Sequence, residues 1–130
     1  MADKIQFLIS GFTIGIIFFQ TALSAPIVFS HLKKDQASIY IRRIFPKIFS
    51  LITIMGLIFL SIHFLFEVEK HTSIANGAIT TLLPFICYLL VPATNKATDL
   101  GNSKTFKYLH ALSVIMICVV FLSNLLWVFI

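Results

Sequence analysis

The chain has 130 residues, of which 58% are hydrophobic and only 12% are charged, and its mean hydropathy is +0.98. Soluble domains are about half apolar and about a quarter charged, so the composition excludes an ordinary soluble protein and indicates a single membrane domain. The net charge is +5, and no aromatic-basic motif accompanies the basic residues. We therefore expect contact with the lipid bilayer and none with nucleic acid.

Four apolar runs follow one another, at approximately residues 5–29, 44–66, 74–91 and 106–130. A helix needs about 20 predominantly apolar residues to cross the hydrocarbon core. We therefore predict an all-α membrane protein, in which residues 1–130 form one domain, a four-helix transmembrane bundle. The residues before the first run carry little net charge, so we expect this run to remain as a span and not to be cleaved as a signal peptide.

The segments between the spans predict how the bundle is oriented. Residues 30–47 and 93–107 share one side of the membrane and carry eight of the ten basic residues. Because Lys and Arg in short loops stay in the cytoplasm, both termini are expected to be extracytoplasmic. Pro46 would then lie in the first turn of the second helix, and Pro92 would end the third.

Gly11 and Gly15 form a GxxxG pair in the first span. Small residues at this spacing allow two helix backbones to approach closely. The motif predicts close packing, with a partner helix either from this chain or from another.

The fourth span carries polar residues on one face. The face is formed by positions i, i+3, i+7 and i+14, which are His110, Ser113, Ile117 and Asn124. Polar groups in a membrane turn toward the interior of a bundle, so we expect this face to be buried and Asn124 to hydrogen-bond across the bundle. Gln20 in the first span is the partner that its chemistry suggests.

The sequence offers few residues for catalysis or cofactor binding. It contains no common catalytic or nucleotide-binding motif, and no acid within a span. His31 and His110 lie at the predicted cytoplasmic level, and His63 and His71 lie near the opposite one. A two-histidine site for haem or a metal would therefore use one of these two pairs and not a mixed pair. Cys87 and Cys118 have no metal-type spacing and are expected to be core residues.

The segments SAPIVFSHL, RIFPKIF and PATN, and a His-x-x-Ser pattern followed by Leu-Ser-Asn, form a recognisable set. They resemble the transmembrane protein 205-like family, known in bacteria as a domain of unknown function. The matching residues are Phe29, Arg43, Phe45, Pro46, Phe49, Asn95, His110, Ser113, Leu122, Ser123 and Asn124. The chain departs from the animal members at Ala111, where they have Gly, and at Ile117, where they have Asn. The resemblance implies a four-helix membrane bundle and no particular reaction.

These patterns predict a site at the cytoplasmic rim, where the end of the first helix meets the starts of the second and fourth. We expect no catalytic residue and no metal ligand in it. The predicted cofactor ligands are His31 and His110. The predicted polar and packing residues of the bundle are Gln20, Pro26, Phe29, Arg43, Phe45, Pro46, Asn95, Ser113, Ser123 and Asn124.

Three functions remain open. The favoured one is a non-enzymatic bundle that binds a lipid, a small apolar ligand or a partner helix, because catalytic groups are lacking. The second is a haem- or metal-binding membrane redox protein that uses the histidines of the rim. The third is a homo-oligomer or an accessory subunit of a larger membrane complex, indicated by the small size and the GxxxG pair.

Overall fold

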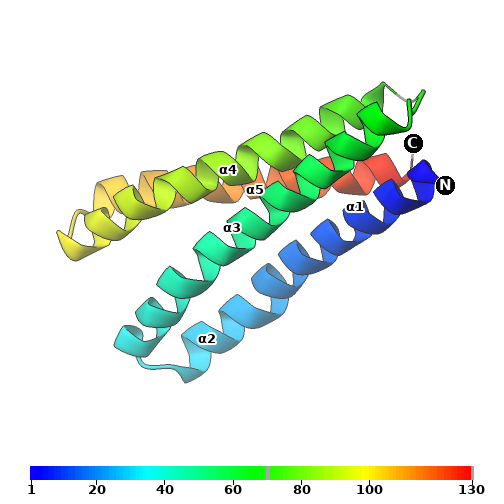
Figure 1. Ribbon diagram of the computed structural model, residues 1–130. Helices are drawn as coiled ribbons and strands as arrows, with labels where there is room; N and C mark the ends of the chain where they lie inside the picture. Colours follow the sequence, from blue (N-terminus) through cyan, green and yellow to red (C-terminus); the bar gives the residue numbers. More distant parts are fainter. Residues whose placement is uncertain (70, 130) are drawn as a thin grey trace.

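The computed structural model describes residues 1–69 and 71–129, and within these residues all regular structure is helical (Figure 1). The elements are α1 (Ala2–Phe18), a π-helix (Phe19–Ser24), α2 (Ala25–His31), α3 (Lys34–Leu65), α4 (Thr72–Asp99) and α5 (Ser103–Phe129). α1, the π-helix and α2 form one continuous span, which we call the N-terminal arm. With α3, α4 and α5 it gives four helices that are long and apolar enough to cross a membrane. The predicted all-α transmembrane bundle is thus confirmed for the described part of the chain.

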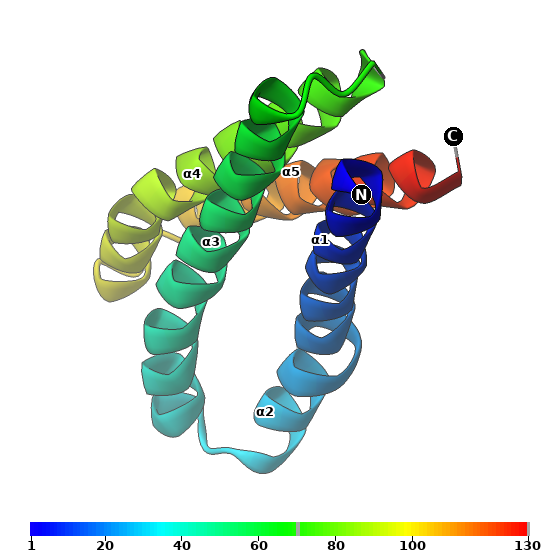
Figure 2. The ribbon, with the colours of Figure 1, turned by 45° about the vertical axis from the view of Figure 1, so that its right-hand side comes forward.

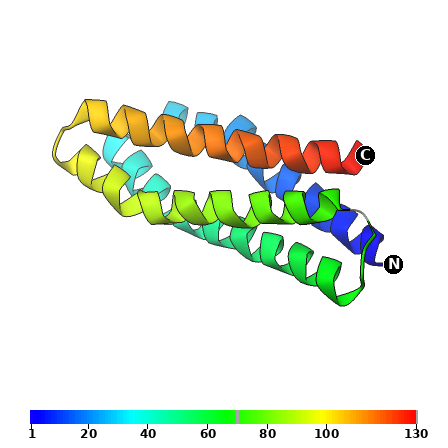
Figure 3. The same cartoon turned by 90° about the horizontal axis from the view of Figure 1, so that it is seen from above.

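The four spans run up and down and close into a ring. α1 contacts α3 and α5, and α4 contacts both α3 and α5. Both termini lie at the same end of the bundle (Figure 3). We call this the terminal end, and we call the opposite end, with the α2–α3 and α4–α5 turns, the basic end.

The apolar core consists of three clusters along the bundle. The cluster at the terminal end contains Ile9, Phe59, Ile62 and Trp127. The middle cluster contains Ile17, Ile52 and Val120. The cluster toward the basic end contains Phe49, Cys87 and Met116, and all the described residues packed around it come from α3, α4 and α5. The N-terminal arm therefore enters the core at the terminal end and in the middle. Toward the basic end it contacts α3 but not α5, and the α2–α3 turn lies apart from the α4–α5 turn (Figure 2).

Two helices extend further than the hydropathy predicted. α3 begins at Lys34 and not at residue 44, and α4 ends at Asp99 and not at residue 91, so Pro46 and Pro92 lie inside helices. Hydropathy reports only the part of a helix that lipid surrounds, and a polar turn can continue the helix into water. The two extensions hold each other, because Arg42 donates a bidentate pair of hydrogen bonds to the Asp99 carboxylate.

The π-helix lies directly before a proline. Pro26 has no N–H, and its ring would clash with the carbonyl four residues earlier in a regular α-helix. The backbone widens here, and the Ala25 N–H donates to the Gln20 carbonyl, five residues back. The N-terminal arm therefore remains helical through the proline with one widened turn.

Two glycines allow α3 and α4 to approach closely. A Cβ at Gly56 would lie 2.5 to 2.7 Å from atoms of Thr80 and Thr81, and a Cβ at Gly77 would lie 2.7 Å from Leu60. Side chains at these positions would push the two backbones apart. The closest helix crossing in the described structure is therefore made by glycines that belong to no sequence motif.

Candidate functional site

The structure does not bring the two predicted cofactor ligands together. His31 is exposed at the end of α2, where its Nδ1 lies 2.6 Å from Ser30 Oγ. His110 is exposed on α5 and stacks on Phe106, with 5.7 Å between the ring centroids. Among the described residues, α2 contacts α3 and the π-helix but not α5. These residues also contain no group of three or more His, Cys, Asp or Glu side chains that could hold a metal ion.

The predicted cytoplasmic rim is not assembled in the structure. Pro26 and Phe29 are exposed on α2, and Arg43 is exposed on α3. Phe45, Pro46 and Asn95 are half-buried, and Phe45 packs on Phe49 with 5.7 Å between the ring centroids. α3, α4 and α5 complete the core here by themselves. The end of the arm consequently has only α3 beside it.

The inward face predicted for α5 holds only in part. Asn124 is buried and Ser113, Ile117 and Ser123 are half-buried, but His110 is exposed. The arm that would cover His110 does not reach α5 at the basic end, so this position faces outward. Cys118 is likewise exposed, contrary to the prediction, whereas Cys87 is buried.

Asn124 hydrogen-bonds across the bundle, but its partners are on α4 and not on the first span. Its Nδ2 donates to Thr80 Oγ1 at 2.8 Å, and Asn76 Nδ2 lies 3.4 Å from its Oδ1. Ser123 Oγ donates to Asn76 Oδ1 at 2.6 Å. We call this set the α4–α5 polar network. The predicted pairing of Asn124 with Gln20 is wrong, because α4 lies closer to this face of α5.

The first span carries a buried polar stripe that the sequence analysis missed. Its members recur at helical spacing and are Gln6, Ser10, Thr13, Gln20 and Ser24. Gln6 Nε2 donates to Ser73 Oγ of α4 at 2.8 Å and to the Phe59 carbonyl of α3 at 3.2 Å. The Ser10 and Thr13 hydroxyls are buried with no partner among the described side chains and backbone. Steps of four and three residues between polar positions were the signal that would have revealed this stripe.

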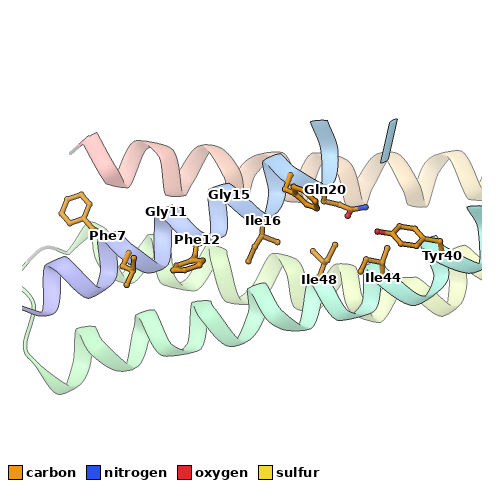
Figure 4. Close-up of a pocket in the computed structure, with 11 residues that line it drawn as sticks. Phe7, Gly11, Phe12, Gly15, Ile16, Gln20, Tyr40, Ile44 and Ile48 are labelled. Carbon is orange, nitrogen blue, oxygen red and sulfur yellow. The ribbon is translucent and has the colours of Figure 1, made fainter. Parts of the chain in front are cut away.

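A groove of about 670 Å³ lies between α1 and α3, and we call it the α1–α3 groove (Figure 4). Apolar side chains such as Phe12, Ile16 and Ile44 form its walls. Gly11 and Gly15 also line it, and a Cβ at either glycine would meet nothing within 4 Å. The predicted GxxxG pair therefore faces open space and has no partner helix within the described chain.

One end of the groove is polar. Gln20 lines it and is only 7% exposed, yet its amide has no hydrogen-bond partner among the described residues. Its amide points toward the hydroxyl of Tyr40 across the groove (Figure 4). That hydroxyl lies 3.1 Å from Ser24 Oγ. Gln20 and Ser24 both belong to the π-helix, and such widened turns occur frequently at functional sites.

A basic side chain lies beside this polar end. Arg43 is exposed and comes three residues after Tyr40, which makes the two neighbours on the surface of α3. It has no carboxylate partner among the described residues, in contrast to Arg42 with its Asp99. Lys47 is also exposed, but it lines a separate hollow with Tyr88 of α4.

The lining of the groove is suited to binding. It contains no carboxylate, imidazole or thiol, which are common catalytic groups. It offers an apolar channel, one unpartnered amide and one phenol, and the two polar groups can hydrogen-bond to a carbonyl or hydroxyl.

Comparison with known proteins gives a family and no function. No curated protein and no solved structure matches the sequence. Residues 8–103 match the family described as Domain of unknown function (DUF4149), and this region holds most of the N-terminal arm and all of α3 and α4. The chain is a small multi-pass membrane protein that belongs to the DUF4149 family.

Proposed function

We propose that this protein is a non-enzymatic membrane bundle that binds a lipid, a small apolar ligand or a partner helix in the α1–α3 groove. One observation carries the proposal: the space over Gly11 and Gly15 is open, since a Cβ at either position would have no neighbour within 4 Å. Helices in lipid associate through close packing around small residues. Here the small residues are present and the chain does not use them.

The orientation and the location are part of the same proposal. The basic end carries Lys33, Lys34, Arg43, Lys47 and Lys104 among others, and the positive-inside rule places it in the cytoplasm. Both termini are then extracytoplasmic, in a bacterial inner membrane. The motif resemblance supports a kinship with the transmembrane protein 205-like family.

An assembly with other chains is a second candidate, supported by the same unfilled glycine pair. The groove would then hold a helix of a second copy or of a larger membrane complex. The haem alternative would require His31 and His110 to act separately or to move together. A visible haem band in the purified protein, lost on replacing either histidine, would support it against the proposal.

Photo-crosslinking in native membranes tests the groove. A benzophenone-bearing phenylalanine replaces Phe12, which lines the groove and is 58% exposed. The matched control carries it at Ile115 of α5, which is 61% exposed and lies outside the groove. We expect a discrete lipid or protein adduct at position 12 that Gly15→Leu removes, and only diffuse lipid labelling at position 115. Equal labelling at both positions, unchanged by Gly15→Leu, would contradict the proposal.

A further inference from the structure

The α1–α3 groove has the length of a lipid chain. The residues of α1 and the π-helix that line it run from Phe7 to Gln20, which corresponds to about 20 Å along a helix. One leaflet of a bilayer contributes about 15 Å of hydrocarbon. An acyl chain from one leaflet therefore fits along the groove.

The polar end of the groove carries a hydrogen-bonding group that a ligand could pair with. Gln20 is a buried amide with no partner among the described residues, and a polar group that remains unpaired in hydrocarbon is costly. An ester carbonyl of a phospholipid can accept a hydrogen bond from the Gln20 amide. The Tyr40 hydroxyl can donate a second one while it keeps its contact with Ser24.

The charge at the polar end favours an anionic headgroup. Arg43 comes three residues after Tyr40, so it is its neighbour on the surface of α3, and it has no carboxylate partner among the described residues. Long basic side chains at a membrane surface extend toward the phosphates. A phosphate held by Arg43 would leave the acyl chains at the mouth of the groove.

Charge also disfavours a second copy of this chain as the occupant. Two copies inserted in one membrane share an orientation, so the basic ends would lie at the same level. The net charge of +5 and the concentration of basic residues at that end would then place like charges side by side, which is unfavourable.

We propose that the α1–α3 groove binds an anionic phospholipid. One acyl chain lies over Gly11 and Gly15, an ester carbonyl bonds to Gln20 and Tyr40, and the phosphate pairs with Arg43. This inference rests on the proposed function and names its ligand.

Native mass spectrometry of the full chain in detergent tests it, with equal amounts of dioleoyl phosphatidylglycerol and dioleoyl phosphatidylcholine added. We expect a one-to-one adduct with phosphatidylglycerol about fivefold more abundant than that with phosphatidylcholine, since a basic residue near a surface contributes about 1 kcal/mol. The variant Arg43→Gln should bind both lipids equally.

Three further variants test where the lipid lies. Gly15→Leu fills open space and Gln20→Leu removes the unpartnered amide, so both should lose most of the phosphatidylglycerol adduct while the melting temperature stays unchanged. Ala111→Leu, a matched control at an exposed small residue of α5, should retain the adduct.

Two results would overturn the inference. Equal adducts of both lipids in every variant would show that the groove does not select an anionic lipid. A protein crosslink at position 12 that Gly15→Leu removes, without any lipid adduct there, would show that the occupant is a helix. That second result would leave the proposed function standing, whereas the absence of any specific crosslink at position 12 would contradict both.

Discussion

The N-terminal arm and the three helices that follow it are held in different ways. α3 and α4 approach closely at Gly56 and Gly77, and α4 and α5 are joined by the α4–α5 polar network, so these three helices form what we call the α3–α4–α5 sector. The arm contributes Ile9 and Ile17 to the core. Its own glycine pair and Gln20 have no partner in the described structure. The α3–α4–α5 side of the bundle is therefore packed within the described chain, whereas the side of the arm leaves room for a ligand.

This difference in packing follows from the lipid that surrounds the helices. Lipid tails are as apolar as the helix surfaces, so burial alone does not drive helices together, and close contact and interhelical hydrogen bonds decide the packing. The α3–α4–α5 sector has both. The arm forms fewer close contacts, and its interhelical hydrogen bonds in the described structure are those of Gln6 at the terminal end and the Ser24–Tyr40 hydroxyl pair. We therefore expect the arm to yield first when the bundle is destabilised.

The largest effect is expected from Gly56→Ala. Its new Cβ would lie 2.5 to 2.7 Å from atoms of Thr80 and Thr81, two of them in the backbone, so α3 and α4 must separate. Overpacking of this kind should lower the free energy of unfolding by about 3 kcal/mol. Unfolding by SDS, followed by helical circular dichroism, measures it.

Gly15→Ala is the matched control, because its Cβ meets nothing within 4 Å. It should be neutral or stabilise the arm by up to about 1 kcal/mol through helix propensity. If Gly56→Ala and Gly15→Ala lowered the free energy of unfolding equally, the packing of the α3–α4–α5 sector would not differ from that of the arm.

A smaller loss is expected from Asn124→Leu. The change removes side-chain hydrogen bonds to Thr80, Asn76 and the Val120 carbonyl. Such bonds in membrane bundles contribute about 0.6 kcal/mol on average, so the free energy of unfolding should fall by about 2 kcal/mol. Gln20→Leu removes no bond within the described chain and should leave it unchanged. A loss at Gln20 as large as that at Asn124 would show that Gln20 has a structural partner.

The spans were predictable from sequence because each apolar run is as long as the hydrocarbon core is thick. Their ends were not. The polar turns from Lys34 to residue 43 and from Pro92 to Asp99 continue α3 and α4, and Arg42 of the first contacts Asp99 of the second. Such a contact between segments distant in sequence leaves no trace in local hydropathy.

The candidate site was predictable only in pieces. Gln20 and the Gly11–Gly15 pair were singled out by residue type, but nothing in the sequence shows that they line one groove with Tyr40. The predicted cytoplasmic rim needs the end of the first span to meet the start of α5. In the structure α2 contacts α3 but not α5, and Phe49 and its neighbours complete the core there without the arm.

Gln6→Leu tests how the arm is attached. Gln6 is fully buried and reaches both α3 and α4, so its loss removes two interhelical hydrogen bonds and should lower the free energy of unfolding by about 1 kcal/mol. Protease or thiol probes placed in α2 should report the loosening before probes in α4 do. Simultaneous exposure of both helices would indicate that the arm and the sector unfold as one unit.

The smallest effect is expected where the two polar extensions meet. Arg42 and Asp99 are exposed, with side chains 33% and 59% accessible, and exposed ion pairs contribute little because water and salt screen them. Arg42→Gln should therefore leave the melting temperature nearly unchanged. It should also reduce the dependence of thermal stability on salt, because the wild-type pair weakens as the ionic strength rises. The double variant Arg42→Gln/Asp99→Asn should behave like the single variant, since both lose the same ion pair. A large drop in melting temperature would mean that the helical extension of α4 depends on this one contact, and α4 would then be expected to fray back toward Pro92.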